Sequence, residues 1–425
     1  MTAPDKRDPN ELRILAPIEA KPKLDYLHYQ VEEIAGFRMN RRRALGLGGM
    51  ALLAAFAAAC GKTTTTTGSG SQPAASGTGA AGDGSLAGKP LESKLELYNW
   101  SQYDAKSTFT NFENLAPEKA AGMTTHEVFY SSNDELLAKL NAGAGGYDII
   151  VPSQNAVAQL IEENKLLAMD HQLLPNLKYL DPAFLKPSYD PTGDYHVIKD
   201  YGISMYYYNN TIVTESPSTM KEFYDLLTKY VSQGRTNILD GAEEVVPLAL
   251  LALGMDPNTD KQSDFDAVNT FLLSIRPGVT TISSYGYIND AIAGKIILGQ
   301  GWNGDVRRIV QGRKAQGDIT PVIPTGASEV WADNWCIPGD APHPVAAHAW
   351  INWLLLPSTA VAEMNYHSYP IPIPDALAQM PPEVTNDPLF NVPAKYTDGY
   401  KYILNVSPSV VQNRTKIYSE FKAAG

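Results

Sequence analysis

Cysteine is scarce, with only Cys60 and Cys336 among 425 residues. Two cysteines are too few for a disulfide scaffold or for a cysteine-ligated zinc site. Cys60 ends an apolar run, whereas Cys336 lies in Trp335-Cys336-Ile337, for which we expect a strand. We therefore expect Cys336 to be a buried free thiol that packs as a small hydrophobic side chain.

Motifs of catalysis and metal binding are also lacking. The chain has no Gly-x-Ser-x-Gly, His-Glu-x-x-His or Gly-Lys-Ser/Thr motif, and none of its 7 histidines forms a pair at metal-ligand spacing. His343 and His348 begin an expected helix, and we expect them to face solvent rather than a metal ion. The sequence thus predicts a protein that is not an enzyme and that holds no metal ion or cofactor.

Basic residues are outnumbered, because 34 Lys and Arg face 46 Asp and Glu for a net charge of −12. This balance argues against a nucleic-acid partner, which clustered basic residues would bind. The 23 tyrosines, against 11 Phe and 6 Trp, suit a wet cleft lined by aromatic rings. Ordinary amphipathic packing is the alternative use for most of them.

One phosphate-binding pattern needs a test of its own. Gly299 to Gly304 matches the Gly-x-Gly-x-x-Gly fingerprint of dinucleotide-binding folds, between an expected strand and an expected helix. Asp305 would repel a pyrophosphate at that helix start, and no acid lies about 20 residues further on. Trp302 also places a bulky ring inside the turn. These features disfavour a dinucleotide.

The N-terminal region has the pattern of an export signal. The segment Asn40-Arg41-Arg42-Arg43 precedes an uncharged apolar run, Ala44 to Ala59. This run is short for a membrane span of about 20 residues. The arginines resemble a twin-arginine signal, and the small residues before Cys60 resemble a bacterial lipobox, although Ala57 stands where Leu is usual. We expect a signal peptide at 39–59 and lipidation of Cys60. Residues 1–38 are an N-terminal extension, or Met39 is the true start.

A Thr-, Gly-, Ser- and Ala-rich segment follows Cys60 and continues to Gly88. Such a composition cannot bury enough apolar surface to offset its ordering entropy. We therefore expect residues 60–93 to hold the lipid anchor and a flexible linker. The folded domain would then be extracytoplasmic and anchored to the cell membrane through Cys60.

From Lys94 onward, strand and helix patterns alternate, which predicts an α/β fold with mostly parallel sheets. The expected strands are 95–99, 124–130, 148–151, 236–239, 279–282, 296–302 and 319–323. The expected helices are 108–115, 134–140, 220–231 and 246–253. Two such sheets indicate two lobes with a cleft between them. Ligands bind at the carboxyl ends of the strands in open sheets of this kind.

Six short motifs occur in order along the folded part of the chain. They are Tyr98-Asn99-Trp100-Ser101-Gln102-Tyr103, Tyr147-Asp148-Ile149-Ile150-Val151-Pro152-Ser153, Glu244-Val245, Trp302-Asn303-Gly304, Trp331-Ala332-Asp333 and Tyr369-Pro370-Ile371-Pro372. Together they resemble the bacterial spermidine/putrescine-binding proteins, and the resemblance extends from about Leu95 to the C-terminus.

This resemblance implies a two-lobed, Venus-flytrap fold, as in periplasmic binding proteins. Lobe one would hold 94–202 and 332–379, and lobe two 203–331 and 380–425. It also implies an extracytoplasmic protein that captures a polyamine, putrescine or spermidine, and delivers it to the permease subunits of an ABC transporter. We expect a monomer.

By the matching positions, the resemblance also implies the residues that contact the ligand. They are Trp100, Ser101, Tyr103, Ser153, Glu244, Trp302, Asp305, Trp331, Asp333 and Tyr369. A polyamine needs carboxylates at its ammonium groups and ring faces along its methylene chain. Asp333 carries this expectation best, because it alternates with Trp331 and Trp335 on one strand face, where an unpaired charge is costly. Glu244 and Asp305 each have an alternative role as acids at helix starts.

Three positions depart from the family pattern. Gly241 stands where a second Asp is frequent, Asn155 where an aromatic residue is common, and Leu404 where a polar contact is frequent. Fewer acids favour a diamine slightly. Two rival interpretations stay open: a protein of the same fold that binds an amino-acid derivative or a sugar, and a secreted enzyme, which lacks a nucleophile–base pair here.

Overall fold

The computed structural model describes residues 85–397 and 399–425. The predicted signal peptide, the lipidation site Cys60 and almost all of the linker lie outside these residues. Residues 86–425 belong to one compact unit. No single helix in this described part is long and apolar enough to cross a membrane, although α11 (Pro344–Leu354) and α12 (Pro357–His367), which meet at an 82° bend, satisfy both criteria as a pair.

The first sheet has three parallel strands in the order β2-β1-β3. They are β1 (Lys94–Trp100), β2 (Thr124–Tyr130) and β3 (Ile149–Ile150). Side chains of β1 alternate between two cores, as the period of a strand requires. Leu95 and Leu97 pack in the core that also contains Phe112 and Trp350, whereas Tyr98 packs with Leu136 on the other face.

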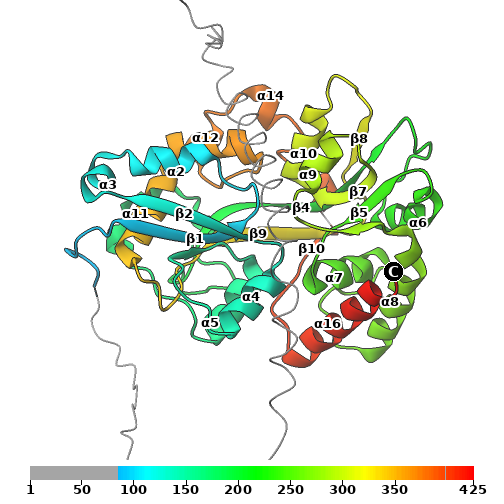
Figure 1. The fold of residues 1–425 in the computed structure, drawn as a ribbon, viewed down its shortest axis with the longest axis horizontal. Coiled ribbons are helices and arrows are strands. Elements are labelled where there is room, and N and C mark those ends of the chain that lie inside the picture. Colours follow the sequence, from blue (N-terminus) through cyan, green and yellow to red (C-terminus); the bar gives the residue numbers. More distant parts are fainter. Residues whose placement is uncertain (1–84, 398) are drawn as a thin grey trace, which may run out of the picture. The chain divides into compact units, whose positions relative to one another are not determined.

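The helices around this sheet come from both halves of the chain (Figure 1). They are α2 (Lys106–Glu113), α3 (Ala116–Ala121), α4 (Asn133–Asn141), α5 (Gln154–Glu162), α11 (Pro344–Leu354) and α12 (Pro357–His367). Short 3-10 helices follow at His171–Leu173, Pro175–Tyr179 and Pro182–Phe184.

The second sheet is mixed, with the order β10-β9-β4-β7-β5-β6, and β8 also pairs with β4. Its strands are β4 (Val197–Asn209), β5 (Arg235–Ile238), β6 (Thr281–Ile282), β7 (Ile296–Trp302), β8 (Ile319–Val322), β9 (Glu329–Trp335) and β10 (Lys401–Tyr402). The long strand β4 pairs antiparallel with β9 along its first half and with β7 along its second half. In Figure 1, β4 and β9 therefore run between the helices at the two sides of the molecule.

Two more cores cover the second half of β4. Tyr206 and Tyr208 face the core with Phe223, whereas Met205 and Tyr207 face the core with Val306. The helices here are α6 (Met220–Tyr230), α7 (Ala242–Ala252), α8 (Gln262–Ile275), α9 (Tyr287–Ile292), α10 (Asn303–Gly312) and α16 (Pro408–Ala423). A 3-10 helix (Arg276–Gly278) and the short helices α13 (Pro374–Leu377), α14 (Pro382–Thr385) and α15 (Ala394–Thr397) complete the chain.

The structure confirms the bounds predicted for β2 and β7 and corrects three other expectations. The second sheet is not mostly parallel, because β4, which sequence reading missed, runs antiparallel to three neighbours. Strand β9 ends at Trp335, although Cys336 still forms an isolated bridge to Ile150 and is a fully buried free thiol, as expected. His348 does not face solvent: it is buried, and its Nε2 accepts a hydrogen bond from the Asp170 amide at 2.9 Å.

Candidate functional site

A pocket of about 610 Å³ gathers side chains that are far apart in the sequence. Its walls are formed by Trp100, Ser101, Gln102, Tyr103, Ser153, Glu244, Ser284, Gly286, Tyr287, Ile288, Trp302, Asp305, Trp331, Asp333 and Tyr369. All ten residues that the sequence singled out for ligand contact are therefore in one place.

The wall that begins at Trp100 is built by the end of β1. The indole Nε1 of Trp100 donates a hydrogen bond to the Val151 carbonyl at 2.9 Å, which fixes the ring beside β3. Its ring lies 5.8 Å from that of Trp302, edge to face. Gln102 follows with φ of 62°, a left-handed conformation that non-glycine residues adopt at a cost and that often marks functional sites. This turn brings Tyr103 back towards the pocket.

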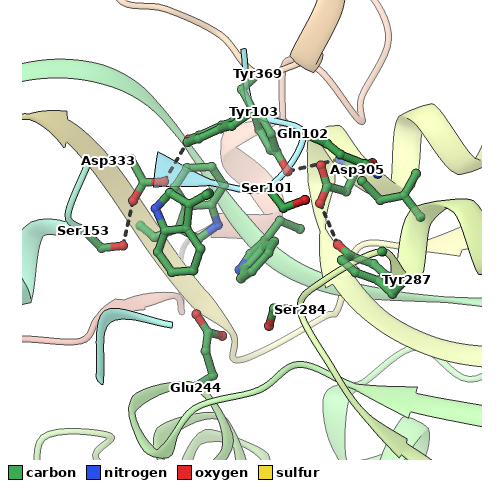
Figure 2. A pocket seen from close by; sticks show the side chains of 15 residues that line it. Ser101, Gln102, Tyr103, Ser153, Glu244, Ser284, Tyr287, Asp305, Asp333 and Tyr369 are labelled. Atoms are coloured by element: carbon green, nitrogen blue, oxygen red, sulfur yellow. Dashed lines mark hydrogen bonds between the residues drawn. The ribbon is translucent and has the colours of Figure 1, made fainter. Parts of the chain in front are cut away.

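Asp333 lies near the end of β9 and is only 6% exposed. The Ser153 hydroxyl donates to its Oδ1 at 2.6 Å, and the Tyr103 hydroxyl donates to its Oδ2 at 2.8 Å (Figure 2). Burial raises the pKa of Asp333 to about 6, while these two hydrogen bonds and the charge of Lys199 act in the opposite direction. Asp333 is therefore mostly ionised at neutral pH and oriented by two hydroxyl donors.

Asp305 lies in the first turn of α10, across the pocket in Figure 2. Tyr287 donates to its carboxylate at 2.8 Å, and its own amide donates to the Tyr369 hydroxyl at 3.1 Å. Arg308, one helical turn further, lies 3.6 Å away. Burial raises the pKa of Asp305, and Arg308 opposes this shift. The sequence analysis did not identify Arg308. Because Arg308 lies close to Asp305, the negative charge of Asp305 is balanced more fully than that of Asp333.

A glycine allows the contact between Tyr369 and α10. A Cβ at Gly304 would lie 2.6 Å from the Tyr369 ring, closer than real Cβ atoms come to other atoms. The Gly in Trp302-Asn303-Gly304 is therefore a requirement of close packing, not of phosphate binding. Asn303 completes this motif, because its Oδ1 accepts from the Ile203 amide at 2.9 Å and so fixes α10 to β4.

Glu244 is in the first turn of α7 and points into the pocket (Figure 2). Asp134, on α4, caps this helix from the other side by accepting from the Ala242 amide at 2.7 Å. Burial raises the pKa of Glu244 well above its usual value, the charges of Glu329 and Asp333 add to the shift, and a hydrogen bond from Trp302 opposes it. Its Oε2 is buried without a hydrogen-bond partner.

A smaller cavity of about 300 Å³ adjoins the pocket, and Trp100, Ser153 and Glu244 line both. Two of the positions that depart from the family pattern, Asn155 and Gly241, line this second cavity. The third, Leu404, is 49% exposed and lines neither.

The predicted acid between two aromatic rings is only half right. Trp331 lines the pocket with Asp333, but Trp335 does not. Its ring packs at 6.2 Å from Trp350 of α11 and covers the ammonium of Lys199 at 4.7 Å. The strand continues past the pocket into the core, so the alternation that put Trp335 on the same face could not show where the pocket ended.

Five residues of the wall were missed, namely Gln102, Ser284, Gly286, Tyr287 and Ile288. Gln102 lies inside a recognised motif, so its position was a usable signal. The other four follow β6, at the carboxyl end of a strand, where binding residues are expected. Within the described residues, no group of three or more His, Cys, Asp or Glu side chains is arranged to hold a metal ion.

Comparison with known proteins places the chain in a family. The family described as bacterial extracellular solute-binding protein matches residues 108–392. The spermidine/putrescine-binding periplasmic protein 1 of Haemophilus influenzae is 30% identical over 331 residues, which are 77% of this chain and 88% of the relative. The chain belongs to the bacterial extracellular solute-binding proteins.

Two further comparisons confirm the fold and the resemblance seen in the motifs of this solute-binding protein. The putrescine-binding periplasmic protein of Escherichia coli is 28% identical over 344 residues, 77% of this chain and 91% of the relative. A solved structure described as a candidate spermidine/putrescine ABC transporter from Listeria monocytogenes has a TM-score of 0.71 at 27% identity, covering 78% of this chain and 99% of that one. The predicted two-lobed α/β binding-protein fold is thus confirmed.

Proposed function

We propose that this solute-binding protein captures polyamines such as putrescine or spermidine outside the cytoplasm and hands them to an ABC importer. The observation that carries the proposal is the charge of the pocket wall. Its fifteen residues include three acids, Glu244, Asp305 and Asp333, and no Lys or Arg. An anionic ligand would meet three carboxyl groups there without a basic partner, whereas ammonium groups would meet acceptors.

The aromatic part of the wall supports a flexible cationic chain. Trp100, Trp302, Trp331 and three tyrosines line the pocket. Ring faces attract ammonium groups by about 0.5–2 kcal/mol and give methylene groups an apolar surface. The names of the relatives point to the same ligands.

The anchoring and the lobe boundaries belong to this proposal as well. The signal peptide with paired arginines would export the chain, and lipidation of Cys60 would anchor it to the membrane. A tether up to residue 93 would then connect the folded domain to this anchor. We propose that the protein is a monomer. Lobe one would contain 94–202 and 332–379, and lobe two 203–331 and 380–425. Glu244 and Asp333 would then lie in different lobes, so a cation between them would favour closure. Nothing in the pocket wall calls for a chemical step, so we propose binding without catalysis.

A thermal-shift panel tests this function directly. Ligand at 100 times Kd stabilises the folded state by about 2.7 kcal/mol, which is a rise in Tm of several degrees. We expect putrescine or spermidine to produce this rise, and neutral sugars and acidic amino acids to produce none. The variant Asp333→Asn should lose the response, whereas Asp225→Asn, at an exposed position on α6, should keep it. A shift with a sugar or an acidic amino acid, and none with any polyamine, would overturn the proposal.

A further inference from the structure

Two adjacent ionisable residues are buried behind the part of the pocket wall that contains Asp333. Lys199 and Asp200, adjacent on β4, are 2% and 0% exposed. The Lys199 ammonium is 2.7 Å from Asp104 Oδ1 but 3.9 Å from Asp200 Oδ2. It also lies 4.3 Å from the centre of the Tyr103 ring. Asp104 is therefore the ion-pair partner of Lys199, and Asp200 is a second carboxyl with no full charge of its own to balance it.

Counting protons shows what Asp200 must do. The hydroxyl of Tyr103 is hydrogen-bonded to both Asp200 Oδ1 and Asp333 Oδ2. A tyrosine hydroxyl has a single proton and can donate to only one acceptor, while its lone pairs accept. Two ionised carboxylates cannot share it. One of the two carboxyl groups must carry a proton and donate to Tyr103.

His367 indicates which of the two oxygens of Asp200 can carry a proton. The Tyr369 amide donates to His367 Nδ1 at 3.0 Å, so in the neutral ring the proton is on Nε2. This Nε2 faces Asp200 Oδ2 at 3.5 Å. Asp200 Oδ2 forms no hydrogen bond, but it faces the N–H groups of His367 and Lys199 at 3.5 Å and 3.9 Å, so a proton on this oxygen would point towards other protons. The remaining oxygen of Asp200, Oδ1, is the one that meets Tyr103.

We propose that Asp200 is held protonated and is a positioning residue for the ligand: Oδ1–H donates to Tyr103, which obliges Tyr103 to donate to Asp333. The hydrogen bonds then run in one direction, from Asp200 through Tyr103 to Asp333. Asp333 is left as the ionised member, with its remaining lone pairs free for an ammonium group. The ligand part of this inference rests on the proposed polyamine function.

The surrounding groups agree with a neutral Asp200. Those that face it or act on it are Lys199, Asp104, His367, Tyr103 and Asp333. Burial raises the pKa of Asp200 well above its usual value, and repulsion by Asp333 and Asp104 adds to this shift, whereas the charge of Lys199 and the hydrogen bond with Tyr103 oppose it. Burial also lowers the pKa of His367 well below its usual value, with Lys199 and Arg308 adding to the shift, so the ring is neutral.

The groups around Asp333 and Lys199 complete this charge balance. Ser153 and Tyr103 donate to Asp333, whereas the carboxyl groups of Glu244 and Glu329 repel it. Glu363, near Lys199 and Asp104, has its pKa raised well above the usual value by burial and by Asp104. The wall at Tyr103 therefore presents a single negative charge, on Asp333, which matches a single ammonium group.

The first experiment needs no ligand and examines the proton itself. Infrared difference spectra at neutral pH, wild type minus Asp200→Asn, should contain the carbonyl stretch of a protonated carboxyl group. The matched control Asp225→Asn, at an exposed and ion-paired site, should show only the bands of a carboxylate. A wild-type spectrum that loses carboxylate bands on Asp200→Asn would show an ionised Asp200 and would overturn the proposal, whatever the protein binds.

The second experiment measures putrescine affinity against pH in Asp200→Asn, Asp200→Ala and Tyr103→Phe. Asn retains the arrangement, since its amide nitrogen can donate to Tyr103 and its oxygen still faces the Nε2–H of His367. We expect Asp200→Asn to match wild type within about threefold, with the same inflection near pH 6, and Asp200→Ala to lose about tenfold. Tyr103→Phe should move the inflection upwards, because Asp333 loses a donor.

An ionised Asp200 predicts a different profile. Removing its charge would then relieve repulsion, so Asp200→Asn would move the inflection well below that of wild type and would weaken binding of a dication. That result would overturn the proposal. If wild type bound no polyamine at all, the proposed function would fail, while the infrared spectra would still decide the protonation of Asp200.

Discussion

Asp333→Asn separates the charge of the pocket wall from its shape. Asn has nearly the size of Asp and retains one oxygen acceptor for Ser153 or Tyr103, whose hydroxyl groups can rotate. The change removes a carboxylate that two side-chain hydroxyls orient. In the described residues no Arg or Lys lies within 4 Å of this carboxylate, whereas Arg308 lies close to Asp305. We expect polyamine binding to weaken strongly and folding to persist.

The magnitude follows from burial. Truncating one partner of a buried, hydrogen-bonded charge pair costs about 2–5 kcal/mol, which is about 30-fold to several thousandfold in Kd. The protein without ligand should change in the opposite direction. Burial raises the pKa of Asp333 from 3.8 to about 6, so ionising Asp333 costs the folded state about 3 kcal/mol at neutral pH.

The sign of the pH effect follows from this shift. Because the pKa of Asp333 is raised in the folded state, the contribution of this group to the free energy of unfolding is highest below about pH 3.8 and falls as the pH rises to about 6. Asp333→Asn removes this fall, so the variant without ligand should be at least as stable as wild type at neutral pH. Urea unfolding at several pH values measures this difference.

Titration calorimetry with putrescine and spermidine gives the affinity, and Asp225→Asn serves as the control for an exposed Asp. The two assays must differ in sign, with affinity lost and stability retained or gained. An affinity of Asp333→Asn within about threefold of wild type would refute the assignment of Asp333 as an ammonium acceptor. Loss of both affinity and folding would refute the argument from burial.

Three further predictions concern pH, packing and anchoring. Wild-type affinity should fall about tenfold per pH unit below about pH 6, as Asp333 gains a proton, and binding at neutral pH should release protons from Glu244. Calorimetry in buffers of different ionisation enthalpy measures both effects. An affinity that does not change with pH would contradict them. Gly304→Ala should displace Tyr369 from Asp305 and weaken binding about tenfold or more. The control Gly317→Ala, at an open position with φ of 63° between α10 and β8, should change stability only; equal affinities of the two variants would disprove the packing argument. Cys60→Ser should release the folded domain from the membrane, measured by fractionation of cells, and a variant still found with membranes would exclude lipidation at this residue.

Local sequence patterns determined much of this protein. The residues of 124–130 and 296–302 predicted two strands with the bounds that the structure has, because strand preference depends on the residue types in a short segment. Short motifs likewise contained nine of the ten proposed contact residues, and most of these lie next to the end of a strand or at the start of a helix. The family itself was visible in these motifs.

Contacts between distant residues were decided only by the tertiary structure. Strand β4 was missed because its Met205-Tyr206-Tyr207-Tyr208 run is apolar on both faces and shows no alternation. Trp335 shares a strand face with Asp333 but packs under α11, and nothing local indicates where that helix lies. The proton of Asp200 depends on Tyr103, His367 and Asp333, which are 97, 167 and 133 positions away in the chain. Burial and the direction of hydrogen bonds are properties of the assembled core, so no window of the sequence contains them.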